Sequence, residues 1–79
     1  MLKAYDLRRK EVININTAEK LGFIRDVEID FETGAIDAVL IPKKFSLLGV
    51  FADTRDYVIS WSDIVKVGRE VILVNYMED

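Results

Sequence analysis

Short apolar runs, in which polar and apolar residues alternate, recur along the 79 residues of this chain. Runs of about four to eight residues between turn residues are typical of β-strands, whereas a helix would repeat its apolar positions with the helical period. The pattern predicts strands at residues 11–14, 23–30, 35–41, 57–61, 64–67 and 71–74. Because five or six short strands leave open edges unless their sheet curls, we expect an all-β fold: a small closed or partly open barrel of antiparallel strands.

The stretch from residue 21 to 42 is the most informative, because it reads as two strands joined by a tight connection. Gly34 can adopt the left-handed backbone conformation at little cost, and the Asp30 side chain can accept hydrogen bonds from amides of its own turn. A loop of about four residues sets Ile29 opposite Ile36 on one apolar face of the hairpin.

At most one helical turn is expected, near residues 16–21. Asn16 or Thr17 can cap such a turn, and Gly22 can end it. We expect the strands and this turn to form a single domain that spans residues 1–79.

Composition narrows the class of protein. Hydrophobic residues make up 51% of the chain and charged residues 32%, which is typical of a globular domain. The chain has no cysteine and no apolar run long enough to span a bilayer, so we expect a cytoplasmic protein without disulfides or membrane insertion. The net charge of −3 gives no electrostatic reason to expect nucleic-acid binding.

Groups that carry catalysis or hold cofactors are scarce. Without histidine or cysteine, the chain lacks the commonest general base, the strongest thiol nucleophile and the main transition-metal ligands. Its four glycines are isolated turn residues rather than a phosphate-binding loop. Trp61 is interpreted as a core anchor, and the basic run at residues 8–10 as a solvated loop. We therefore expect no enzyme, no catalytic residue, no cofactor and no bound metal.

One acidic constellation leaves two interpretations open. Asp26, Glu28 and Asp30 share one face of the first hairpin strand, and the expected register sets Asp37 opposite Glu28. Like charges directly opposite one another cost stability, so a hard cation or a basic partner would relieve the repulsion. The alternative is a solvated acidic face with no ligand.

A second candidate is the apolar segment at residues 45–51. Large apolar side chains are unusual in a connection between strands, and an exposed patch of them marks an interaction surface. The alternative is that the segment forms a further strand or covers an open barrel end, and so belongs to the core. Five residues make up this candidate partner-binding set: Phe45, Leu47, Leu48, Val50 and Phe51.

The order and spacing of these motifs resemble the PRC-barrel domain family over nearly the whole chain. The resemblance looks closest to the small stand-alone members of the YlmC/YmxH type, with archaeal single-domain members second. It rests on Lys10-Glu-Val-Ile-Asn14, Lys20-Leu-Gly22, Val27-Glu-Ile-Asp30, Glu32-Thr-Gly34 and Leu40-Ile-Pro42, followed by Asp56-Tyr-Val-Ile-Ser-Trp61, Lys66-Val-Gly68 and Val71-Ile-Leu-Val74.

The resemblance implies a role in docking. Barrels of this family occur in the photosynthetic reaction-centre H subunit, in the ribosome maturation factor RimM, and in small proteins linked to sporulation or archaeal cell division. They supply no catalytic residue to carry over. We interpret the chain as a non-enzymatic interaction or adaptor module that self-associates, with a homodimer favoured, or docks on an unidentified protein. The alternative is a small binding protein that holds a metal ion or metabolite at the acidic strand face or the barrel mouth.

Overall fold

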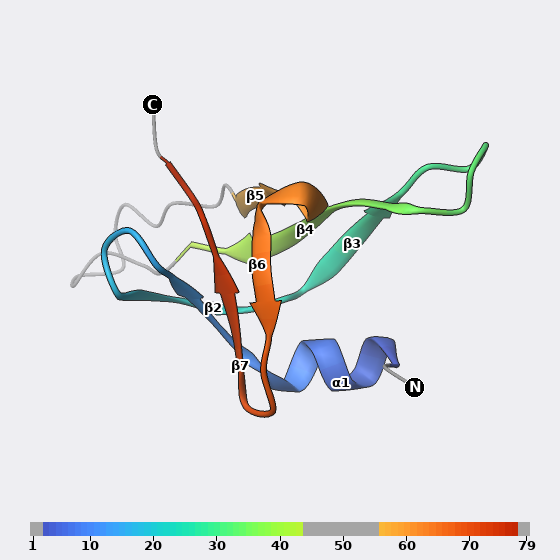
Figure 1. The fold of residues 1–79 in the computed structure, drawn as a ribbon. Helices are drawn as coiled ribbons and strands as arrows, with labels where there is room; N and C mark the ends of the chain where they lie inside the picture. The colour runs from blue at the N-terminus through green and yellow to red at the C-terminus, as the bar shows by residue number, and fades with distance from the viewer. Residues whose placement is uncertain (1–2, 44–55, 78–79) are drawn as a thin grey trace, which may run out of the picture.

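A computed structural model of the chain describes residues 3–43 and 56–77. Figure 1 shows two of its strands, β3 and β4, extending away from the others as a long hairpin. Within the described ranges the elements are α1 (Ala4–Arg9), β1 (Glu11–Asn14), β2 (Glu19–Phe23), β3 (Asp26–Ile29), β4 (Ile36–Pro42), β5 (Asp56–Ser60), the 3₁₀ turn η1 (Trp61–Asp63), β6 (Ile64–Val67) and β7 (Val71–Val74).

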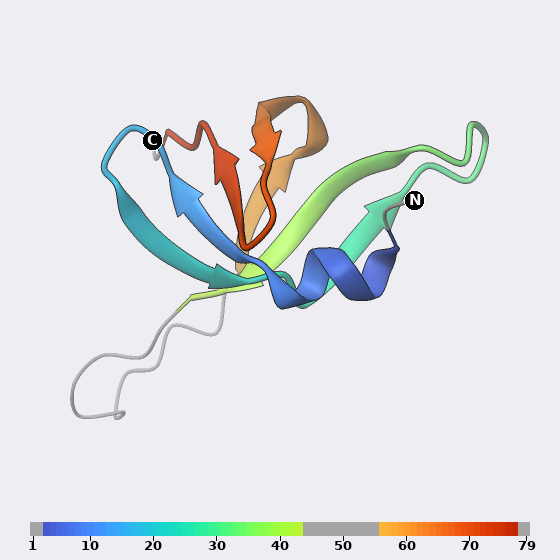
Figure 2. The ribbon, with the colours of Figure 1, turned by 60° about the horizontal axis from the view of Figure 1, so that its bottom comes forward.

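The strands form two sheets, one in the order β2-β1-β7-β6 and the other in the order β3-β4-β5. β1 and β7 run parallel, and the other pairs are antiparallel. The chain crosses between the sheets from β2 to β3 and again from β5 through η1 to β6. No strand pairing in the described ranges joins the two sheets, so they form a partly open barrel (Figure 2).

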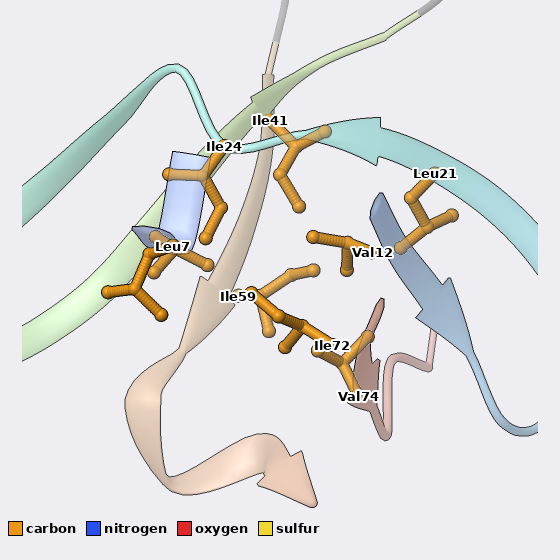
Figure 3. Close-up of a cluster of buried hydrophobic side chains, with 9 residues drawn as sticks. Leu7, Val12, Leu21, Ile24, Ile41, Ile59, Ile72 and Val74 are labelled. Atoms are coloured by element: carbon orange, nitrogen blue, oxygen red, sulfur yellow. The ribbon is translucent and has the colours of Figure 1, made fainter. Parts of the chain in front are cut away.

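Apolar side chains from both sheets and from α1 fill the interior of the barrel (Figure 3). Alternation along β1 and β7 turns every second side chain inward, as the burial of Val12, Ile72 and Val74 shows. Full burial of one such side chain stabilises the fold by about 1.5–3 kcal/mol. The buried cluster consists of Leu7, Val12, Leu21, Ile24, Val39, Ile41, Ile59, Ile72 and Val74.

Gly22 brings the first sheet close to the second. The pairing of β1 with β2 shifts by one residue at Leu21, which is the extra residue of a β-bulge. The next residue, Gly22, has a φ of +123°, a conformation that L side chains rarely adopt. A Cβ added there would lie 3.4 Å from Cγ2 of Ile41. The bulge and the glycine therefore let the backbone of β2 approach β4 at this corner of the barrel.

The fold class predicted from the sequence is confirmed: the chain is mostly strands arranged as a partly open barrel. The described residues form seven strands rather than five or six, because Glu19–Phe23, most of which was not predicted as strand, forms β2. Phe23 ends β2, and β3 begins at Asp26. No helix in the described ranges is long and apolar enough to cross a membrane.

The helical turn expected near residues 16–21 is wrong. Residues 15–18 form a turn between strands, with Ala18 at a φ of +59°, and β2 begins at Glu19. The Thr17 hydroxyl accepts a hydrogen bond from the Glu19 amide (3.2 Å) and so serves this turn rather than capping a helix. The extended conformation is favoured over a helical turn here, because it lets β2 pair with β1 and so provides hydrogen-bond partners for its amides and carbonyls.

The β3–β4 hairpin contains a bulge that changes the predicted register. Glu28 pairs with Ala38, so Asp37 is an extra residue and does not lie opposite Glu28. The expected like-charge pair therefore does not form. The shift sets Val27 opposite the fully buried Val39, which keeps apolar side chains on the core side of the hairpin.

Candidate interaction surface

The apolar segment at residues 45–51 lies outside the described residues. The partner-binding set proposed from the sequence, namely Phe45, Leu47, Leu48, Val50 and Phe51, therefore stays a prediction. The search for a functional surface turns to the parts of the barrel that the structure describes.

Two carboxylates of the acidic face, those of Asp26 and Asp30, accept hydrogen bonds from nearby backbone amides. Asp26 Oδ1 accepts a hydrogen bond from the Val27 amide (2.8 Å), and Asp30 Oδ1 accepts one from the Glu32 amide (2.9 Å). Within residues 3–43 and 56–77 no group of three or more carboxylates could hold a metal ion. The described residues therefore give the cation hypothesis no support.

The helix α1 was not predicted from the sequence, because residues 8–10 were interpreted as a solvated loop. Asp6 accepts a hydrogen bond from the Lys3 amide (3.1 Å), a pairing that favours a helix start. Leu7 is 5% exposed and fixes α1 to the barrel core. The sequence signal was weak, since a helix of six residues has room for only one fully buried side chain.

A groove of about 350 Å³ lies between α1 and the β3–β4 hairpin. Figure 2 shows the helix running alongside the hairpin, with its N-terminal end toward the hairpin tip. The apolar part of its wall comes mainly from Leu7, Val27, Ile29 and Ile36. Ile29 and Ile36 pair directly, as the sequence predicted, and they form the outermost apolar pair before the turn.

Large apolar side chains of α1 and of the hairpin are exposed, and one of them, Ile29, lines the groove. Phe31, in the turn of the hairpin, is 99% exposed, Tyr5 on α1 is 66% exposed, and Ile29 is 50% exposed. Exposed apolar residues gathered beside a concave site are typical of protein-binding surfaces. We call the groove together with Tyr5, Ile29 and Phe31 the helix–hairpin surface.

The groove and the hairpin tip carry opposite charge. Arg8 and Arg25 border the groove together with a single acidic residue, Asp26. The Arg25 guanidinium forms an ion pair with Asp56 at the start of β5 and remains 59% exposed. The tip, by contrast, carries Asp30 and Glu32 on either side of Phe31.

A second hollow, of about 480 Å³, is lined entirely by charged residues from α1 and the β6–β7 turn. Lys10 spans it, because its ammonium group donates hydrogen bonds to the carbonyl oxygens of Gly68 and of Arg69 (3.0 Å to the latter). This hollow joins α1 to the first sheet, and its walls are mainly polar. Its members are Asp6, Arg9, Lys10, Arg69 and Glu70.

A third hollow, of about 260 Å³, lies beside Asn14, a buried polar residue that the sequence analysis did not single out. The Asn14 amide donates to the Tyr76 carbonyl oxygen (2.9 Å) and accepts from the amides of Tyr76 (3.2 Å) and Asn16 (3.1 Å). The Tyr76 ring meets Tyr57 edge to face, with ring centroids 5.3 Å apart. These contacts fix the segment after β7 to the barrel, which is a structural role.

The geometry defines a class of protein: a small, partly open β-barrel with an apolar groove and, among its described residues, no cluster of metal-binding groups. The chain matches the PRC-barrel domain family over residues 1–79, and it belongs to that family.

Comparison with individual proteins supports the same assignment. The chain is 37% identical over 78 residues to the probable sporulation protein YlmC of Bacillus subtilis, in an alignment that covers 99% of this chain and 96% of that protein. It is 31% identical over 80 residues to the uncharacterized protein YmxH of the same organism, with coverage of 99% and 93%. An uncharacterized protein of Clostridium acetobutylicum is 42% identical over 69 residues, with coverage of 87% and 78%. The resemblance to the YlmC/YmxH type is confirmed.

Proposed function

We propose that this protein is a non-enzymatic interaction module of the PRC-barrel family that binds other protein chains through its helix–hairpin surface. The observation that carries the proposal is the exposure of Phe31 and Ile29 on a projecting hairpin beside an apolar groove. An aromatic side chain that is 99% exposed has no packing role in the isolated barrel, whereas burial against a partner would remove its apolar area from water.

The charge pattern suits binding rather than catalysis. The groove combines an apolar floor with the charged rim formed by Arg8 and Arg25, which is the arrangement of a protein interface with a polar border. The relationship to the probable sporulation protein YlmC is compatible with a role in a larger cellular assembly, and we place that role in the cytoplasm because the chain carries no cysteine.

Residues 45–51 enter the proposal as a second, separate contribution. Polar replacement of Leu48 and Phe51 is expected to lower the size of the assemblies while the β-rich circular dichroism spectrum is retained. Loss of the spectrum would assign the segment to the core and remove it from the interaction surface.

Affinity purification from cells of the source organism tests the helix–hairpin surface. The surface variant carries Ile29→Ser and Phe31→Ser, and the control variant carries Val58→Ser and Val65→Ser. Val58 and Val65 are 55% and 56% exposed, which matches the 50% exposure of Ile29, but they lie on β5 and β6, away from the groove.

We expect the wild type and the control variant to recover the same bound proteins, further copies of this chain included, and the surface variant to lose them. Thermal unfolding of all three proteins checks that the barrel is intact. Recovery of the same bound proteins by the surface variant would contradict the proposal.

A further inference from the structure

We propose that a second copy of this chain occupies the groove, so that two copies form a reciprocal dimer in which the hairpin tip of each lies against α1 of the other. This inference rests on the proposed function and names the partner of the same surface. Phe31 is the inserted side chain, and Glu32 of one copy faces Arg8 of the other.

The tip is built as a defined projection. The Gly34 amide donates to the Asp30 carbonyl oxygen (2.7 Å), and the Asp30 amide donates to the Ala35 carbonyl oxygen (2.9 Å). The Asp30 carboxylate accepts the Glu32 amide inside the turn. These bonds fix the backbone of the turn that carries the exposed Phe31, so little backbone entropy is lost when the ring docks.

The receiving groove matches the tip in polarity. Its floor includes the apolar side chains of Leu7 and Ile29, and Arg8 stands on its rim. A tip that carries an aromatic ring between two acidic residues can place the ring against the apolar wall and an acidic side chain against the Arg8 guanidinium. The groove combines these two features.

The spacing along the hairpin makes the contact self-complementary. Val27 and Ile29 lie about 7 Å apart along β3, and Phe31 lies beyond Ile29 in the turn. When two hairpins lie antiparallel about a two-fold axis at Ile29, each tip reaches the base of the other hairpin, beside the other copy's α1. A two-fold dimer then forms every tip-to-groove contact twice.

The mass of the purified full chain in solution, measured by sedimentation equilibrium from micromolar to near-millimolar concentration, tests the dimer. We expect the wild type to reach twice the 9.1 kDa of one chain. Phe31→Ser is expected to remain a monomer throughout and to melt like the wild type at concentrations where the wild type is also monomeric. A wild type that stays monomeric at the highest concentration, or a Phe31→Ser variant that dimerises like the wild type, would overturn the inference.

A charge exchange tests the orientation. Arg8→Glu and Glu32→Arg, made separately, place like charges together at two symmetric positions and should each raise the dimer dissociation constant about tenfold. The double variant restores opposite charges and should return to within about threefold of the wild type. Equal weakening in the double variant and the single variants would overturn the proposed facing of Arg8 and Glu32.

The two proposals fail in different ways. If the wild type is monomeric but the Ile29→Ser and Phe31→Ser variant still loses its bound proteins in cell extracts, the interaction module stands and its partner is another protein. If the dimer forms but cell-extract binding does not depend on these residues, the dimer and the proposed function are separate properties.

Discussion

Asn14 offers a sharp test of how the barrel is held together, because a single side chain replaces part of a missing strand pairing. It lies at the end of β1, is 4% exposed, and forms hydrogen bonds with both the amide and the carbonyl of Tyr76, two residues beyond β7. It also accepts the Asn16 amide. The change to test is Asn14→Ala.

The expected cost follows from the loss of the hydrogen bonds of the Asn14 side chain. A net hydrogen bond contributes about 0.5–1.5 kcal/mol, and polar groups left buried without partners add to the loss. Asn14→Ala should therefore lower the free energy of unfolding by about 2–4 kcal/mol. For a chain of this size about 1 kcal/mol shifts the melting temperature by about 4–8 °C, so the melting temperature should fall by about 8–32 °C.

Asn75→Ala is the matched control. Asn75 belongs to the same cluster but is exposed, and its side chain accepts one hydrogen bond from the Asn16 side chain (2.6 Å). We expect a loss below about 1 kcal/mol for this control in the same denaturant titration. Equal losses for Asn14→Ala and Asn75→Ala would refute the reasoning.

Three further predictions concern the barrel and its hairpin, each measured by denaturant unfolding. Gly22→Ala should lose about 1–3 kcal/mol of unfolding free energy, because its φ of +123° is strained for an L residue. Gly34→Asn should lose less than about 1 kcal/mol, since Asn tolerates a φ of +75° and nothing lies within 4 Å of an added Cβ. Similar losses at both glycines would contradict the argument. Leu7→Ala should lose about 2–4 kcal/mol through the cavity left between α1 and the core, and a change below about 0.5 kcal/mol would show that α1 is not anchored there. Phe31→Ser should alter the stability of the monomer by less than about 0.5 kcal/mol, because Phe31 is 99% exposed; a larger loss would show that the ring packs within its own chain.

Much of the strand framework could be predicted from local patterns. The bounds of β1, β6 and β7 agree with the alternating runs at residues 11–14, 64–67 and 71–74, and Gly34 and Gly68 mark turns as expected. Alternation is a local signal, because one face of each strand must meet the core. It does not report which strands are neighbours, so the parallel pairing of β1 with β7 was not foreseen.

The features that were missed depend on distant contacts. α1 is only six residues long, and it is fixed by the burial of Leu7 in a cluster that also contains Ile24 and Ile59. The bulge at Asp37 is set by the demand that Val39 stay buried, which no pattern within the hairpin reveals. The helix–hairpin surface combines both features, so the sequence could not place it.

Phe31 illustrates the difference between a motif and a site. In the sequence it is one residue of a turn that the flanking Asp30 and Gly34 define. In the structure the same turn lies at the end of the projecting β3–β4 hairpin (Figure 1) and leaves the Phe31 side chain 99% exposed. The turn chemistry that specifies the fold thus also presents the side chain on which the proposed function rests.

Site-specific photo-crosslinking in living cells tests the central claim most directly. A photoreactive phenylalanine analogue is placed at position 31, and in a second strain at position 65, where Val65 is 56% exposed on β6. We predict that irradiation produces adducts above the monomer mass from position 31 and few or none from position 65. Adducts from position 65 alone, or equal adducts from both positions, would contradict the claim that this protein works through its helix–hairpin surface.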